Sequence, residues 1–289
     1  MIGQLREGLG QRIEVLCPLV LLGLAAIGFL GPEPRPIQEG AAWPSLAHPL
    51  GVDMLGRDFL SVIAVGVTDF VAPGLLAVFA LIGALGLRTW VALQRPVLPD
   101  YGAPESAPGG LAGASPPRLL IVLLGMLLLE EPSPLVAGTI VLVLYLPVAL
   151  NEVASQLRDL REQEVLAGAM AHGLPLRRVL GTYLLLGYLK ETIARHAAAL
   201  FTQVAFTQIA LSYLFGASSV RAGFSTSWGM EFNRLGPWLL PRRQGMFCPP
   251  EGVCVEAVGM MHAVILLTLI AVLLGGLLRL AQPKRVGSA

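Results

Sequence analysis

The sequence is poor in charged side chains. Asp, Glu, Lys and Arg together make up 13 % of the 289 residues, whereas hydrophobic residues make up 55 % and the mean hydropathy is +0.70. A typical soluble domain carries about 25 % charged residues. The composition therefore excludes an ordinary soluble protein and indicates a polytopic membrane protein.

The chain also has no excess of charge of either sign. Its formal net charge is +1, and its Lys and Arg residues are scattered along the sequence. Nucleic-acid-binding proteins need a clustered basic surface. We therefore expect no nucleic-acid partner.

Motifs that carry chemistry are missing from the sequence. It contains no G-x-x-x-x-G-K-[ST] loop, no H-E-x-x-H and no G-x-S-x-G. We therefore expect that the chain is not an enzyme, that it holds no metal or cofactor, and that any ATP hydrolysis takes place on a separate polypeptide.

Cysteine is scarce, and its spacing matches no metal site. Cys17 lies in the first apolar run, and Cys248 and Cys254 flank the stretch CPPEGVC. The second pair could close a disulfide in an oxidising compartment, whereas in a cytosolic loop both thiols would stay reduced. Both alternatives stay open.

Long apolar runs dominate the rest of the chain. A membrane helix needs about 20 apolar residues, and EEPSP leaves only a tight turn between the third and fourth runs, which predicts a helical hairpin. We expect an all-α integral membrane protein with six transmembrane helices, and the first is expected to be an uncleaved signal anchor. The six runs are Val15–Leu30, Val71–Leu93, Leu111–Leu129, Leu135–Ala149, Thr192–Phe215 and Val258–Leu280.

The basic residues predict the orientation. With the amino terminus inside the cell, fourteen of the twenty Lys and Arg residues fall in inside segments, which is the bias that membrane proteins show. Both termini are then cytoplasmic, as is the Gly- and Pro-rich linker 95–117. Residues 31–68 and the loop with Cys248 and Cys254 face the outside.

The first external segment contains the stretch HPLGVDMLGRDFLSVIAVG, from His48 to Gly66. This stretch closely resembles the scoop-like external element of permeases of the dipeptide/oligopeptide/nickel family of ABC importers. Glycines allow tight turns, and the charged side chains can form a local ion cluster. The scoop could brace the fold or contact a binding protein; its residues are His48, Gly51, Asp53, Gly56, Arg57 and Asp58.

A second stretch lies between the fourth and fifth runs, at about 152–190. A helix continues out of the membrane over 151–161, and a short Ala-rich helix then ends at Gly173, with Pro175 just beyond it. This stretch resembles the EAA coupling loop of ABC importer permeases, which docks into a groove on the ATPase. Three family positions differ, because Ala167 replaces Glu, Gly168 replaces the first Ala and Met170 replaces Arg. The resemblance assigns the ATPase interface to Ala167, Ala169, His172, Gly173, Arg177 and Arg178.

A third resemblance covers Ala210–Phe232, whose LSYLFG run and Ser-Trp-Gly triplet are similar to the end of the fifth helix in the same family. Taken alone, Trp228 beside a glycine at a membrane exit is typical of an interfacial anchor. Within the fifth run, Gln203, Thr207 and Gln208 share one region of the helix. Two alternatives stay open for these three: hydrogen bonding between helices, or lining of a translocation pathway.

Together the resemblances imply a permease subunit of type I ABC importer fold that moves di- or oligopeptides across a bacterial inner membrane. The implied organisation is a first helix with its periplasmic scoop over 1–70 and a five-helix permease core over 71–289. The implied partners are a homologous permease subunit in a heterodimer, two ATP-binding subunits that carry ATP and Mg, a solute-binding protein, and membrane lipid. Alternatives are transport of nickel or a metal chelate, export, a transporter working alone, or a scaffold that has lost transport.

Overall fold

A computed structural model describes most of the chain. The described residues are 2–31, 34–37, 40–94, 121–122, 124–125, 133–162, 168, 171–173, 178–214, 227–239 and 255–280. Over these ranges the regular secondary structure is helical, apart from three isolated antiparallel bridges in the loop at residues 36–58. Five long helices form the body: α1 (Ile2–Leu30), α2 (Phe59–Gln94), α4 (Pro134–Glu162), α7 (Lys190–Leu214) and α9 (Val255–Leu280).

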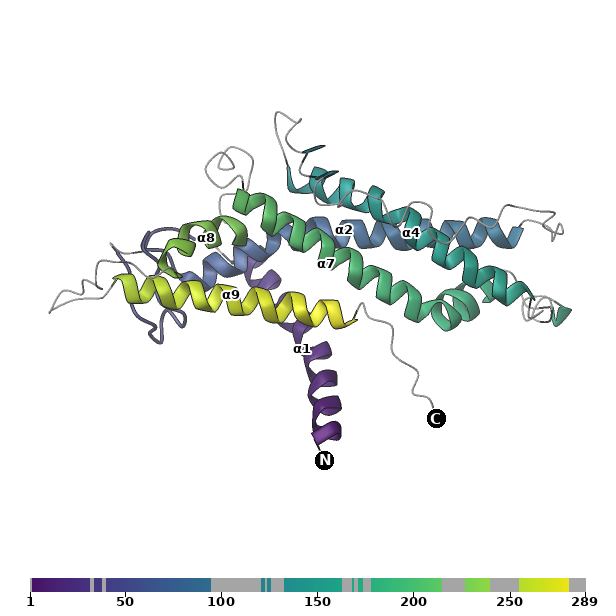
Figure 1. The fold of residues 1–289 in the computed structure, drawn as a ribbon, viewed down its shortest axis with the longest axis horizontal. Helices are drawn as coiled ribbons and strands as arrows, with labels where there is room; N and C mark the ends of the chain where they lie inside the picture. The colour runs from purple at the N-terminus through teal and green to yellow at the C-terminus, as the bar shows by residue number, and fades with distance from the viewer. Residues whose placement is uncertain are drawn as a thin grey trace.

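Shorter helices lie at the two ends of this body (Figure 1). At one end, α8 (Trp228–Leu235) and the 3₁₀ turn η3 (Gly236–Leu239) lie beside the loop that joins α1 to α2. We call this the loop end. At the opposite end, called the far end, the π-helix η1 (Val179–Tyr188) leads into α7, close to where α4 finishes.

Four of the described helices are long and apolar enough to cross a membrane, and this indicates a multi-pass membrane protein. They correspond to the second, fourth, fifth and sixth predicted runs. Their spanning parts are Phe59–Ala92, Pro134–Leu160, Lys190–Leu214 and Val255–Leu277.

The remaining two predicted spans differ in their outcome. The apolar part of α1 runs from Leu16 to Leu30. It is shorter than a membrane-spanning helix, which needs about 20 apolar residues. The third predicted run lies almost entirely outside the described residues. The six-helix permease fold therefore stays a prediction.

The second helix begins earlier than the hydropathy pattern predicts. It starts at Phe59 instead of Val71, and the division at residue 70 consequently falls inside α2. Asp58 caps this start, because its Oδ2 accepts a hydrogen bond from the Ser61 backbone N–H at 2.9 Å. Ser133 gives α4 a similar start, with its hydroxyl accepting from Val136 and Pro134 in the first helical position.

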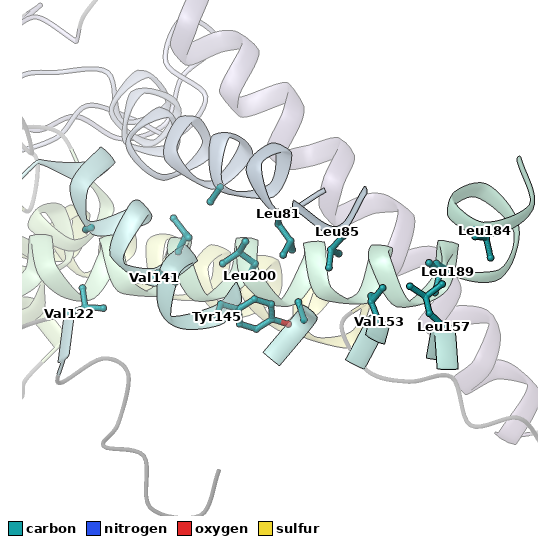
Figure 2. Packing of buried hydrophobic residues seen from close by; sticks show 14 of the residues in the cluster. Leu81, Leu85, Val122, Val141, Tyr145, Val153, Leu157, Leu184, Leu189 and Leu200 are labelled. Carbon is teal, nitrogen blue, oxygen red and sulfur yellow. The ribbon is translucent and has the colours of Figure 1, made fainter. Parts of the chain in front are cut away.

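The buried apolar side chains form two clusters that share α2 and α7. Figure 2 shows the first cluster, in which Leu81 and Leu85 of α2 pack with Val141 and Tyr145 of α4 and with Leu200 of α7. The second cluster joins α1, the loop-end half of α2, α8, α9 and Ala205 of α7. Because α2 and α7 contribute to both clusters, these two helices hold the body together.

Candidate functional site

The loop before α2 is folded tightly around its two glycines. Gly51 and Gly56 have φ angles of +81° and +77°, a region that favours glycine. A Cβ atom on Gly51 would lie 2.6 Å from the Ala42 carbonyl oxygen. Beside it, Val52 exchanges two backbone hydrogen bonds with Ala42, at 3.0 and 3.1 Å. The tight turns predicted for these glycines are confirmed.

Asp53 and Arg57 form the centre of this loop. Asp53 Oδ1 accepts from the backbone N–H groups of Leu55 and Arg57, at 2.9 and 2.8 Å. Its Oδ2 accepts from Arg57 Nε and Nη2, at 2.9 and 2.6 Å. Both side chains are buried, so these bonds replace water for the two charges.

Arg57 also reaches a residue far away in the sequence. Its Nη2 donates to Glu231 Oε1 of α8 at 3.0 Å, and Arg234 donates to the same oxygen at 2.9 Å. Glu231 is 3 % exposed, so it is buried like Arg57, whereas Arg234 is half-buried. Burial alone would lower the pKa of the Arg57 guanidinium, but Glu231 and Asp53 outweigh this effect and raise the pKa above its usual value.

The predicted cluster of Asp53, Arg57 and Asp58 is therefore only partly correct. Asp58 turns away from Arg57, caps α2, and lies 3.1 Å from His48 Nδ1 through its Oδ1. Glu231 was missed by the sequence argument, although it stands three residues after Trp228 in the third resembling stretch. Its position at the start of a short helix was the available signal.

The loop is also fastened to α9. His262 Nε2 lies 2.8 Å from the Leu50 carbonyl oxygen, and its ring stacks on Phe59 with a centroid distance of 3.9 Å. His262 is completely buried. Residues 48–62 are thus held on one side by α8 and on another by α9.

Each residue of the Ser-Trp-Gly triplet has its own structural role. The Ser227 hydroxyl accepts from the Met230 N–H and caps α8. The Trp228 indole Nε1–H donates to the Ile63 carbonyl of α2 at 2.8 Å. A Cβ atom on Gly229 would lie 2.0 Å from the Ile209 carbonyl, so only glycine allows α8 to approach α7 this closely. Trp228 is 1 % exposed, so it packs inside the protein and does not have the exposed position that is typical of an interfacial anchor.

The polar residues of α7 are directed mainly at α4. Gln208 Nε2 donates to the Pro134 carbonyl at the start of α4, and Arg195 pairs with Glu152. His196 Nδ1 lies 2.7 Å from Tyr145 Oη. Gln208 therefore makes a hydrogen bond between two helices. This is one of the two roles considered for Gln203, Thr207 and Gln208, the other being the lining of a translocation pathway. Thr207 is also buried, and Gln203 is half-buried.

The predicted coupling residues are only partly described. His172 is exposed, and its N–H donates to the Gly168 carbonyl at 3.1 Å. Gly173 follows with φ +74°, which is typical of a glycine that ends a helix. Arg178 is exposed at the start of η1. Ala167, Ala169 and Arg177 lie outside the described residues, as do Cys248 and Cys254.

In its described residues the protein is an all-helical membrane protein. At its loop end, the loop before α2 packs against the short helix α8. Comparison of the sequence with protein-family models and with curated proteins finds no match in either.

Proposed function

We propose that this chain is a permease subunit of a type I ABC importer of the dipeptide/oligopeptide/nickel kind, with di- or oligopeptides as its cargo. In this mechanism a solute-binding protein delivers the cargo at the loop end. Two ATP-binding subunits close on coupling loops at the far end, and the cargo passes between this chain and a homologous permease subunit. ATP binding then biases a two-state rocking of the bundle.

The observation that carries this proposal is the fold of the resembling stretch itself. Its residues from His48 to Ser61 form a loop with two positive-φ glycines, a buried ion pair and a capped helix start. Arg57 and His262 fasten the loop to α8 and α9. A rigid, braced surface of this kind suits a protein that must dock a partner without losing its shape.

The far end supports the second half of the mechanism. The turn at His172 and Gly173 is exposed, and the helix η1 that follows it in the chain lies at the far end (Figure 1). His172, Gly173 and Arg178 are accessible there for a cytoplasmic partner. Glu152 and Arg195 pair across α4 and α7, in the half of each helix that is nearer to this end.

The proposal is tested by site-specific photocrosslinking in cells that express the chain together with the genes next to it. A crosslinker at His172 is expected to capture a subunit with a G-x-x-x-x-G-K-[ST] nucleotide loop. The same crosslinker at Leu46, which is fully exposed in the external loop, is expected to capture a solute-binding protein. The two positions serve as controls for each other.

Transport itself is measured by vanadate-sensitive uptake of a radiolabelled dipeptide, with nickel uptake run in parallel. His172→Glu places a negative charge on the turn and is expected to abolish uptake without reducing the amount of purified protein. Uptake of nickel alone would shift the cargo to a metal. A chain that crosslinks to no ATPase and supports no uptake would contradict the proposal and favour a scaffold.

A further inference from the structure

Three helices meet closely at one level of the body. A Cβ atom on Gly138 of α4 would lie 3.1 Å from Pro73 Cβ of α2 and 3.7 Å from Val204 Cγ1 of α7. Figure 1 shows α2, α4 and α7 running side by side through this region. The absence of a side chain at Gly138 therefore allows the three backbones to come together here.

One helical turn nearer the loop end, the same three faces carry polar groups. Asp69, Pro134 and Gln208 each stand four residues from Pro73, Gly138 and Val204, respectively. Residues four apart lie on the same face of a helix. Since α4 and α7 run in opposite directions, Pro134 and Gln208 remain at one level, and the hydrogen bond from Gln208 Nε2 to the Pro134 carbonyl shows this directly.

Two oxygen atoms in this region are buried without a donor. In the described part of the chain, neither Gln208 Oε1 nor Asp69 Oδ2 has a hydrogen-bond partner. Both are acceptors while the carboxyl of Asp69 is ionised. Asp69 is half-buried as a residue, but its Oδ2 is shielded from solvent. A shielded carboxylate oxygen without a donor is costly in a membrane span, and such groups normally lose their charge instead.

We propose that Asp69 is a proton-binding site, in which the protonated carboxyl donates its O–H to Gln208 Oε1 at the level of the Pro134 carbonyl. One proton on Asp69 neutralises its carboxylate. The resulting O–H group gives Asp69 Oδ2 a partner and gives Gln208 Oε1 a donor. A metal ion fits less well, because the described residues contain no group of three His, Cys, Asp or Glu side chains that could hold one.

Several titratable groups of the neighbouring helices are bonded to other partners. On the faces nearest to Asp69, α1 packs Gly28 against Thr68, and α8 packs Trp228 against Phe70. Among the described residues, Tyr145 and His196 contact each other, Glu152 pairs with Arg195, Glu231 with Arg57 and Arg234, His262 with the Leu50 carbonyl, and Cys17 with the Val272 carbonyl. Tyr213 stands five residues after Gln208 on α7, and Glu256 lies in the first turn of α9.

The site couples protonation to conformation. While the three helices are closed, the proton stays between Asp69 and Gln208. If they separate and water enters, the O–H bond of Asp69 breaks, the proton passes to a water molecule as hydronium, and the carboxylate is hydrated. A conformation that exposes Asp69 is therefore favoured at high pH. This inference stands independently of the proposed transport function.

The test is infrared spectroscopy of the full chain in lipid nanodiscs, with aspartate labelled by ¹³C at its side-chain carboxyl. At neutral pH we expect a carbonyl band of a protonated aspartic acid that shifts with the label. Asp69→Asn should remove this band, whereas the matched control Glu191→Gln, an exposed carboxyl in the first turn of α7, should leave it unchanged.

Two further variants make the result decisive. Gln208→Leu should keep the band but move it to higher frequency, because the acceptor is lost. Should Asp69→Asn not yield folded protein, Asp69→Glu retains an acid without the label, and the label-dependent shift should disappear. A wild-type protein without the band, or a label-sensitive band that survives in either Asp69 variant, overturns the proton site. A band that does not move in Gln208→Leu overturns the pairing with Gln208.

Discussion

Replacing Arg57 with alanine should destabilise the protein far more than replacing Arg234, although both arginines bind the same oxygen of Glu231. The side chain of Arg57 is 9 % exposed and that of Arg234 is 35 % exposed. Removing one partner of a buried ion pair costs about 3–5 kcal/mol, because a charge is left uncompensated. Exposed pairs contribute about 0–1 kcal/mol.

We expect the loss in free energy of unfolding caused by Arg57→Ala to lie near the lower limit of that range. Glu231 keeps Arg234, and Asp53 keeps two backbone N–H donors, so neither carboxylate is left without any partner. We therefore expect the free energy of unfolding to fall by about 3 kcal/mol. For Arg234→Ala we expect a fall of less than about 1 kcal/mol.

Both values are measured by reversible chemical unfolding in mixed micelles, followed by tryptophan fluorescence. Trp228 lies against α2 and reports on the same region. The double variant Arg57→Ala with Glu231→Ala should lose less than the sum of the two single variants, because the residues share one interaction. Equal losses for Arg57→Ala and Arg234→Ala would refute the idea that the buried network holds the loop on α8.

Two further substitutions test how α8 is attached. Gly229→Ala should lower the free energy of unfolding by about 1–3 kcal/mol, because the new methyl group would lie 2.0 Å from the Ile209 carbonyl. Its control Gly236→Ala has open space at the Cβ position, and an equal loss in that control would argue against the close contact. Trp228→Phe should lower the free energy of unfolding by about 1 kcal/mol, because the indole hydrogen bond to the Ile63 carbonyl is lost. This variant removes the fluorescent reporter, so its unfolding and that of the wild type are followed by far-ultraviolet circular dichroism; no loss would show that the bond contributes nothing.

Hydropathy predicted the four long apolar helices well, because their membrane-length runs leave few alternatives. It placed the start of α2 too late, at Val71, since Thr68 and Asp69 interrupt the apolar run that begins at Phe59. The capping carboxylate and the Ser61 that it binds were the local signals of the true start.

The tertiary contacts of the loop could not be predicted in the same way. Arg57 and Glu231 are separated by 174 positions, and no periodic pattern connects them. Trp228 illustrates a second limit, because a tryptophan at the end of an apolar run can face lipid or lie buried under a neighbouring helix. The adjacent Gly229 favoured the buried arrangement, since glycine permits close backbone approach.

The α4–α7 interface is held differently at its two ends. At the far end, Glu152 pairs with Arg195 and lies 3.0 Å from His196 Nε2, but its side chain is 36 % exposed. At the loop end, Gln208 binds the Pro134 carbonyl from a buried position. Water weakens exposed ion pairs and cannot easily replace buried bonds. Separation of these helices therefore costs least at the far end, and α7, which belongs to both apolar clusters, would carry that movement to the loop end.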